Sequence, residues 1–205
     1  MIRFIGDIHA MWTGYENLIK NCDKTIQIGD FGLGFPGYDF PEHLLKIPGN
    51  HRFIRGNHDN PEVCQNHPWY LGDYGYIKEN DMFYLGGAWT PDFYKRTEGI
   101  DWWREEELEY KELQDAVDLY VRVKPTLVVT HECPRTIKKH LGLNRYPDND
   151  GNPFKRTRTD NALQVMFEMH QPNIWVFGHY HRRIREREKG TLFCALEKFG
   201  IFDLD

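Results

Sequence analysis

The sequence predicts an α/β fold built on mixed β-sheets. Short apolar runs with β-type side chains recur along the chain, and each run ends at a glycine or a polar residue. Segments with helical patterns lie between these runs, and such alternation is typical of layered α/β proteins. Two further regions have the pattern of hairpins, so we expect antiparallel strands beside the parallel ones. The 205 residues show no linker and no internal repeat, which indicates one domain, 1–205.

Five runs are expected to form the strands that alternate with helices. They are Ile2–Ile5, Thr25–Ile28, Phe53–Ile54, Thr126–Val129 and Ile174–Phe177. Hairpin strands are expected over Tyr74–Ala88, and over Arg183–Asp205 with a turn at Lys189–Gly190. The stretch Asn144–Thr159 is polar and rich in proline, glycine and aspartate, so we expect a long loop there.

Four segments between the strands carry helix signals. Two of them begin with cap patterns, namely a capping box and an asparagine followed by proline at the first helical position. The other two carry the pattern of a helix that ends at a proline, and the longer one has an apolar stripe. The segments are Thr13–Glu16 ahead of Leu18 and Ile19, Asn60–Pro61, about Glu105 to Lys124, and Thr159 or Asp160 to Gln171.

Composition narrows the functional classes. With 40% hydrophobic residues, a chain of this length can bury a core without disulfides. A net charge of −5 does not favour a nucleic-acid or membrane-surface protein, and no apolar run approaches the ~20 residues of a spanning helix. The N-terminus has no signal-peptide pattern, so we expect a cytoplasmic protein without a membrane partner. The cysteines form no CxxC pair and are expected to be buried and reduced: Cys22, Cys64, Cys133 and Cys194.

Polar side chains follow each of the five strands. In chain order they belong to Gly6-Asp7-Ile8-His9, Gly29-Asp30, Gly56-Asn57-His58-Asp59, Thr130-His131 and Gly178-His179-Tyr180-His181. Ligand crevices of layered α/β proteins lie outside the carboxyl ends of the strands, so these side chains are expected to converge at one sheet edge. A glycine precedes the polar group in four of the five motifs, which allows the backbone to approach an ion or a phosphate closely.

The converging side chains supply imidazole nitrogens and hard oxygens but no thiolate. This set suits Mn, Fe, Zn or Ni better than a cysteine-type zinc site. It holds too many donors for one ion and about the right number for two. Two ions that share a carboxylate, roughly 3.5–4 Å apart, clamp the attacking and leaving oxygens of a phosphoryl displacement. The expected ligands are Asp7, His9, Asp30, Asn57, His131, His179 and His181.

Taken together and in this order, the motifs D-x-H, GD, GNH[DE], H and G-H-x-H resemble those of the calcineurin-like metallophosphoesterase family. The resemblance extends from Asp7 to His181. It implies a four-layer α/β sandwich, with two mixed β-sheets between helices, and a hydrolase of phosphate esters. It also implies two divalent ions, manganese first among them. One ion is assigned to Asp7, His9 and His181, the other to Asn57, His131 and His179, and Asp30 bridges them.

The resemblance implies roles for further residues. A hydroxide shared by the two ions attacks phosphorus, while His58 assists the leaving group, oriented by Asp59 or a neighbouring carboxylate. Each ligand histidine is expected to donate its other ring N–H to a carbonyl or carboxylate. Arginine matches phosphate geometry, so Arg55, Arg156 and Arg158 are candidates for substrate binding. For Arg55 a structural salt bridge is an equal alternative.

Several substrate classes stay open. Protein Ser/Thr phosphatases of this family carry GDxxDRG and GNHE, whereas Phe31-Gly32 follows Asp30 here and the third motif ends in Asp59. Family nucleases usually add a capping domain, for which 205 residues leave little room. Two divalent ions would bring the charge from −5 only to −1, which does not favour DNA. We therefore expect a phosphodiester or a small nucleotide. A protein phosphatase, a nuclease and a non-catalytic scaffold are the alternatives, and protein partners are unknown.

Two more patterns have competing interpretations. The run from Gly32 to Gly37 spells GxGxxG, but Pro36 and Pro41 obstruct the helix that a dinucleotide site needs, so we expect a plain glycine-rich loop beside Asp30. A stretch rich in aromatic residues has two interpretations: its side chains are buried in the hydrophobic core, or they form a surface on which a nucleobase or aryl group stacks. Its members are Trp89, Phe93, Tyr94, Trp102 and Trp103.

Overall fold

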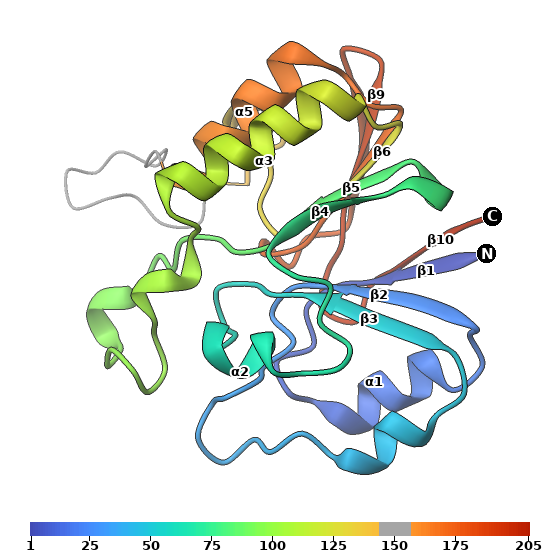
Figure 1. The fold of residues 1–205 in the computed structure, drawn as a ribbon, viewed down its shortest axis with the longest axis vertical. Coiled ribbons are helices and arrows are strands. Elements are labelled where there is room, and N and C mark those ends of the chain that lie inside the picture. The colour runs from blue at the N-terminus through green and yellow to red at the C-terminus, as the bar shows by residue number, and fades with distance from the viewer. Residues whose placement is uncertain (144–156) are drawn as a thin grey trace.

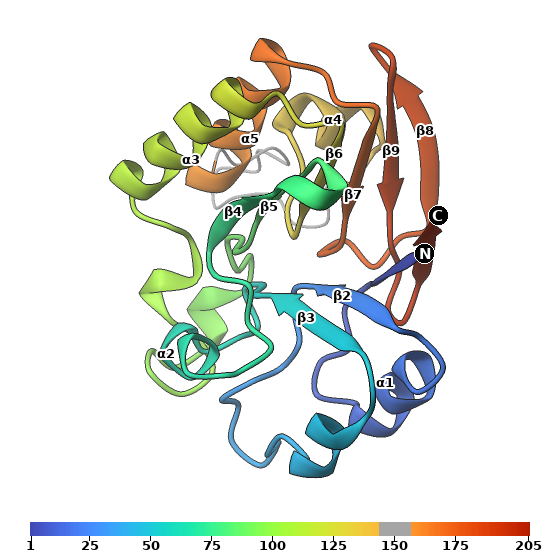
Figure 2. The same cartoon turned by 45° about the vertical axis from the view of Figure 1, so that its right-hand side comes forward.

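The strands form two mixed sheets that pack face to face, with helices on both outer sides (Figures 1 and 2). This computed structural model describes residues 1–143 and 157–205. The layers follow the order helices, six-stranded sheet, four-stranded sheet, helices. The predicted fold class is therefore confirmed.

The four-stranded sheet, sheet A, has the order β10-β1-β2-β3. The three inner strands are β1 (Ile2–Ile5), β2 (Lys24–Ile28) and β3 (Asn50–Ile54), which run parallel to one another. The edge strand β10 (Ile201–Leu204) pairs antiparallel with β1. The sequence predicted β1 at its observed bounds, whereas β2 and β3 begin earlier than expected.

The six-stranded sheet, sheet B, has the order β4-β5-β6-β7-β9-β8. Its central strands are parallel and its edge strands β4 and β8 are antiparallel, as the two hairpin patterns predicted. Lys189 and Gly190 both have positive φ between β8 and β9, as a tight two-residue hairpin turn requires. The strands are β4 (Tyr74–Ile77), β5 (Met82–Leu85), β6 (Leu127–Thr130), β7 (Ile174–Phe177), β8 (Ile184–Glu188) and β9 (Thr191–Ala195).

In residues 1–143 and 157–205, five α-helices cover the sheets. They are α1 (Trp12–Ile19), α2 (Pro61–Gln65), α3 (Tyr110–Val123), α4 (Arg135–His140) and α5 (Arg158–Met169). Short 3-10 turns occupy Glu42–Lys46, Lys78–Asn80, Phe93–Lys95 and Arg104–Glu106. The sequence did not predict α4.

The observed helix starts correct two predictions and confirm one. The capping box at Thr13 is wrong, because α1 already begins at Trp12 and its cap residue Met11 makes no side-chain bond. The long helix α3 begins later than predicted, because Glu109 and Glu112 form a capping box after a separate 3-10 turn. The Asn60 cap is confirmed, since its side chain accepts bonds from the backbone amides of residues 62 and 63.

The predicted loop Asn144–Thr159 falls mostly outside the described residues. Its last residues belong to the start of α5, because Thr157 caps that helix and accepts a bond from the backbone amide of Asp160. This helix therefore begins slightly earlier than predicted, and the side chain of Asp160 completes a capping box.

Apolar side chains fill each space between the layers. Ile26 and Ile28 of sheet A face Val129 and Val176 of sheet B in the central layer. Helices α3 and α5 pack on the other face of sheet B, while α1 and α2 pack on the other face of sheet A (Figure 1). All four cysteines are buried and free, as expected.

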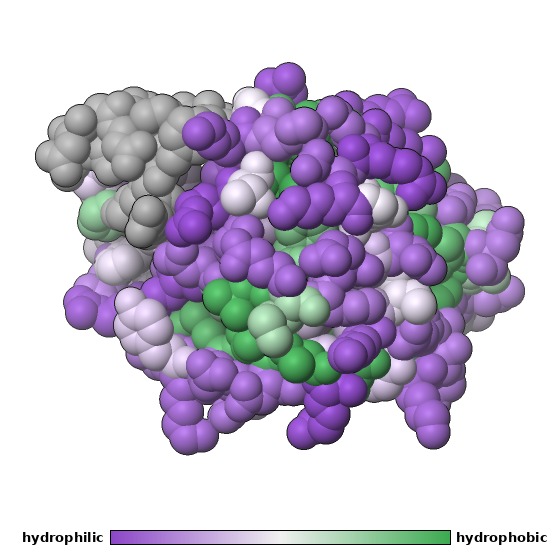
Figure 3. Space-filling view, turned by 90° about the horizontal axis from the view of Figure 1, so that it is seen from above, coloured by the Kyte–Doolittle hydropathy of each residue, from purple (hydrophilic) through white to green (hydrophobic). Residues whose placement is uncertain are grey.

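The surface above α3 and α5 is mainly hydrophilic (Figure 3). Helix α3 buries Leu113, Ala116 and Tyr120 against the core and directs charged residues outward. In residues 1–143 and 157–205, no helix has the length and apolar content that crossing a bilayer requires.

Candidate metal centre

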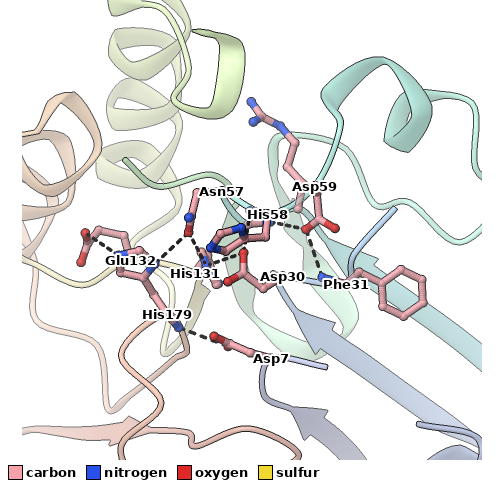
Figure 4. Close-up of polar contacts among 12 residues, drawn as sticks. Asp7, Asp30, Phe31, Asn57, His58, Asp59, His131, Glu132 and His179 are labelled. Atoms are coloured by element: carbon pink, nitrogen blue, oxygen red, sulfur yellow. Dashed lines mark hydrogen bonds and ion pairs between the residues drawn. The ribbon is translucent and has the colours of Figure 1, made fainter. Parts of the chain in front are cut away.

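The carboxyl ends of strands from both sheets meet at one edge, and the loops that follow them carry the candidate ligands. Strands β1, β2 and β3 of sheet A deliver the first four, and β6 and β7 of sheet B deliver the other three. Figure 4 shows several of these side chains directed toward a common centre. The structure thus brings together all seven predicted ligands: Asp7, His9, Asp30, Asn57, His131, His179 and His181.

Backbone strain is concentrated at this edge. Four of the seven residues have left-handed φ values, namely His9 (45°), Asp30 (56°), His179 (67°) and His181 (52°). Such conformations cost of order 1–3 kcal/mol each and persist where the surrounding structure enforces them. Gly56 adds a close approach, because a Cβ atom there would lie 2.3 Å from the backbone nitrogen of Asp30. The loops are shaped to hold these side chains together.

One group of donors consists of Asp7, His9, Asp30 and His181, whose donor atoms all lie within 4.8 Å of one another. The Nε2 atoms of His9 and His181 are 3.0 Å apart. His181 Nε2 is also 2.9 Å from Asp7 Oδ2. Asp7 Oδ2 is buried, and although His181 Nε2 lies close to it, no hydrogen bond of suitable geometry reaches this oxygen from the described residues.

The second group consists of Asp30, Asn57, His131 and His179. Asn57 Oδ1 lies 2.8 Å from His179 Nδ1 and 3.2 Å from His131 Nε2. His131 Nε2 is in turn 3.2 Å from Asp30 Oδ1. The other carboxylate oxygen of Asp30 faces the first group, at 3.8 Å from His9 Nε2. Asp30 therefore lies between the two groups and directs one oxygen to each.

These separations fit bound cations. Ligand atoms about 2.1 Å from one ion in neighbouring positions of its shell lie about 3 Å apart, which matches most of the distances above. The donors are nitrogens and hard oxygens, the set that suits Mn, Fe, Zn or Ni. The buried Asp7 oxygen, which lies beside His181 Nε2 but accepts no well-aligned hydrogen bond from the described residues, adds a position that a cation would satisfy.

The charges of the centre favour the same conclusion. Burial lowers the pKa of His9 and of His179 to about 4, so both rings are neutral and keep a free lone pair. For His131, burial acts in the lowering direction, but Asp30 and Asp7 outweigh it and raise its pKa to about 10. Burial also opposes ionisation of Asp30, yet the histidines around it hold its pKa well below the ordinary value. The buried carboxylates thus attract positive charge into this site.

Partners behind the histidines fix their orientation. His131 Nδ1 lies 2.9 Å from the carbonyl oxygen of Ile28, so it donates there while Nε2 faces the centre, as expected for a ligand. His179 Nε2 lies 3.9 Å from a carboxylate oxygen of buried Glu132. The Tyr180 hydroxyl and Lys138 also bond to Glu132, which keeps this carboxylate in place.

The orientation of Asn57 depends on a buried relay. Its Nδ2 donates to Thr90 Oγ1 over 3.1 Å, and the Thr90 hydroxyl donates in turn to Glu106. The Thr90 backbone amide donates to the same carboxylate over 2.7 Å. Because the amide nitrogen of Asn57 is engaged in this way, its oxygen is left to face the two histidines.

Replacing Thr90 by valine is expected to weaken divalent-cation binding roughly 10- to 100-fold, because the side chain keeps its shape but loses the hydroxyl that orients Asn57. Calorimetric titration of the metal-free protein with Mn²⁺ measures this effect. The matched control is Thr191→Val, since Thr191 is equally buried and its hydroxyl donates to the carbonyl of Pro172, in a bond that involves no candidate ligand. Equal Mn²⁺ affinity in both variants would contradict the relay.

Asp59 makes a set of backbone contacts that the sequence did not predict. Its oxygens accept bonds from the backbone amides of residues 31, 32, 33 and 56. The carboxylate therefore ties the loop after β2 to the loop after β3 (Figure 4). The orientation of His58 by Asp59 or a neighbouring carboxylate stays a prediction. Among the other carboxylates, the negative charges of Asp30 and Asp92 act to raise the pKa of the His58 ring, against the lowering effect of burial.

The candidate arginines have protein partners. Arg55 is 4% exposed, with Nε 2.5 Å from Asp73 Oδ1 and Nη1 donating to the carbonyl of Glu106. The structure therefore favours the salt-bridge alternative for Arg55. Arg158 pairs with Glu109 over 3.1 Å at the start of α5. Arg156 lies outside the described residues.

Replacing Arg55 by methionine is expected to lower the free energy of unfolding by about 3 kcal/mol, because the change leaves Asp73 without its partner in a mostly buried place. The KM for a bis-aryl phosphate, the expected class of substrate, should change little. Denaturant unfolding and steady-state kinetics measure the two quantities. A large rise in KM with unchanged stability would restore the phosphate-binding alternative.

Sequence reasoning missed several supporting residues. Glu132 and Tyr180 directly follow the ligand residues His131 and His179 in the chain, and this adjacency is a signal that could have identified them. Thr90 and Glu106 lie in an irregular stretch with no motif, so nothing in the sequence indicated them.

The family follows from a match over most of the chain. A model of the calcineurin-like phosphoesterase family matches residues 1–183. The chain belongs to this family. This family membership confirms the resemblance that the five motifs indicated, and it agrees with the observed two-sheet sandwich. A search of curated protein sequences gave no significant match.

Solved structures share the fold of this phosphoesterase. A protein from Staphylococcus aureus described as a 5'-nucleotidase, solved with alpha-ketoglutarate, is 16% identical with a TM-score of 0.52. The similarity covers 100% of this chain and 51% of that one, so this chain spans about half its length. The phosphopantetheinyl hydrolase PptH from Mycobacterium tuberculosis is 12% identical with a TM-score of 0.52, and the similarity covers 96% of this chain and 89% of PptH. At these identities the likeness concerns the fold alone.

Proposed function

We propose that this protein is a metal-dependent phosphoesterase that hydrolyses a phosphodiester or a small nucleotide. The observation that carries the proposal is the position of Asp30, which directs one oxygen to each of two groups of donors. A buried carboxylate between two such groups suits a pair of divalent ions better than one ion.

Each donor group would hold one ion. Asp7, His9 and His181 would bind the first, Asn57, His131 and His179 the second, and Asp30 would bind both. When bound, two divalent ions supply a water of lowered pKa as nucleophile and neutralise charge on the phosphoryl oxygens. The protein contributes imidazole nitrogens, a fixed Asn57 oxygen and a backbone that keeps the donors in place before substrate arrives.

His58 would assist the leaving group. Its backbone amide donates to Asp30 Oδ1 over 2.8 Å, which fixes the start of the side chain beside the centre. Its ring lies 5.3 Å from the ring of His9. Burial lowers the pKa of His58, so its ring is neutral at pH 7 and offers one N–H to an oxygen of the substrate. The negative charge of a bound phosphate favours the protonated ring, from which a proton can pass to the leaving oxygen.

The charge of the site favours a diester over a monoester. A diester carries one negative charge near neutral pH, whereas a monoester carries close to two. Arg55 and Arg158 are engaged in ion pairs, so neither side chain is free to balance the second negative charge of a monoester.

Activity assays with defined cations test this proposal. Metal-free protein is reloaded with Mn, Ni, Zn or Mg and offered a mono-aryl and a bis-aryl phosphate. We expect metal-dependent hydrolysis with preference for the bis-aryl ester. Preference for the monoester would indicate a phosphatase instead, and absence of hydrolysis with every cation would favour the scaffold alternative.

A further inference from the structure

A small cavity lies beside the candidate metal centre, on the side of His9 and His58. Its volume is about 150 Å³, and its wall consists of His9, Ala10, Gly32, Phe35, Tyr38 and His58. Three of these residues, Gly32, Phe35 and Tyr38, belong to the glycine-rich loop 32–38, which comes shortly after β2 and Asp30 in the chain. The motifs of the metal centre do not include this loop.

The base of the loop is rigidly held. The Asp59 carboxylate accepts bonds from the amides of residues 31 to 33, and the Asn60 amide donates to the carbonyl of Leu33. Gly32 permits close contact with the loop after β1, because a Cβ atom there would lie 2.3 Å from the backbone nitrogen of Ala10. Asp59 and Gly32, which lie next to the metal centre, therefore also fix the start of the loop that carries Phe35 and Tyr38.

Aromatic rings border the cavity next to His58. The ring centre of Phe35 lies 5.8 Å from that of His58 and 5.2 Å from that of Trp103. Trp103 is buried and supports Phe35 from behind, whereas Tyr38 is 56% exposed at the opening. Among the described residues, those that line the wall include no lysine or arginine, and Phe35 and Tyr38 give it flat apolar surface.

We propose that this cavity binds one flat aromatic ring of the substrate while its phosphate lies at the metal centre. The proposal rests on the function proposed above and narrows it to phosphoesters that carry an aryl group or a nucleobase. A cavity of about 150 Å³ is the size that accommodates a benzene ring in a protein interior. Aromatic side chains favour planar rings because stacking brings two flat faces into contact.

Binding of inert phosphonates tests the proposal independently of turnover. Calorimetry on the Mn-loaded protein compares phenylphosphonate with cyclohexylphosphonate, which have the same charge and nearly the same size but differ in flatness. We expect the wild type to prefer the phenyl compound, and Phe35→Ala to weaken its binding roughly 5- to 100-fold. Phe35→Trp should retain the preference. The control Tyr110→Ala removes an exposed aromatic ring from α3 and should leave it unchanged.

A second pair of probes separates the two sources of the ring. An adenosine 5'-phosphonate and a ribose 5-phosphonate differ only in the base, so a preference for the first that Phe35→Ala abolishes identifies a nucleobase. If Phe35→Ala abolishes the preference for phenylphosphonate and the adenosine compound is never preferred, the ring belongs to an aryl ester.

Equal binding of phenyl- and cyclohexylphosphonate to the wild type, or an unchanged preference in Phe35→Ala, would overturn the ring site. Diester hydrolysis without any ring preference would refute this inference and leave the proposed function intact. A preference for ring-bearing phosphonates without hydrolysis of any ester would refute the proposed function and leave the ring site intact.

Discussion

Replacing Asp30 by asparagine is expected to lower kcat/KM for a bis-aryl phosphate more than about 100-fold. This loss exceeds the roughly 10- to 100-fold loss that is usual when a residue that holds a metal ligand in place is replaced. The change removes the negative charge that faces both donor groups. It also replaces one of the two carboxylate oxygens, which face His9 and His131, by an NH₂ group that cannot bind a cation. Asparagine tolerates the left-handed backbone of this position, where φ is 56°, so the fold should persist.

Elemental analysis of the Asp30→Asn protein should show fewer bound cations than the wild type. Asp203→Asn is the control, because Asp203 is a partly exposed aspartate paired with Arg3 on the edge of sheet A. Wild-type activity in the Asp30 variant would refute the assignment of Asp30 as the shared ligand.

Replacing His58 by alanine is expected to reduce kcat about 10²- to 10⁴-fold, the range typical of a lost general acid. The bond from residue 58 to Asp30 comes from the backbone amide, so alanine retains it. The variant therefore removes the ring chemistry and should keep the cation content of the wild type. Kinetics and elemental analysis on the same preparation measure both properties.

His43→Ala serves as the control for His58, because the His43 side chain is 61% exposed and pairs with Glu16 on the surface. We expect this control to retain wild-type kcat. A His58→Ala protein with near-normal kcat would show that the ring takes no part in the reaction. Loss of the bound cations would show that His58 supports the centre itself.

The candidate ligands could be found from the sequence because they obey a simple geometric rule. Asp7, Asp30 and Asn57 directly follow apolar strands, and parallel strands of a layered α/β fold end at the same edge. His131 and His179 follow strands of the other sheet, so their convergence depends on how the two sheets pack. The resemblance to a known family supplied that packing, which local patterns alone do not contain.

Other features could not be read from local patterns, for physical reasons. The carboxylate of Asp59 lies one residue from His58, but only the fold shows that it turns to the amides of a distant loop. Arg55 precedes a ligand motif, yet its partner Asp73 depends on how the chain crosses from sheet A to sheet B. The Thr13 capping box failed because cap patterns leave helix starts uncertain by a few residues.

The central claim is that two divalent cations occupy this edge and share Asp30. Diffraction from Mn-loaded crystals, recorded for the anomalous signal of manganese, tests it most directly. The account predicts two peaks per chain, one among Asp7, His9 and His181 and one among Asn57, His131 and His179, with Asp30 in contact with both. A single peak, or peaks away from these residues, would contradict it.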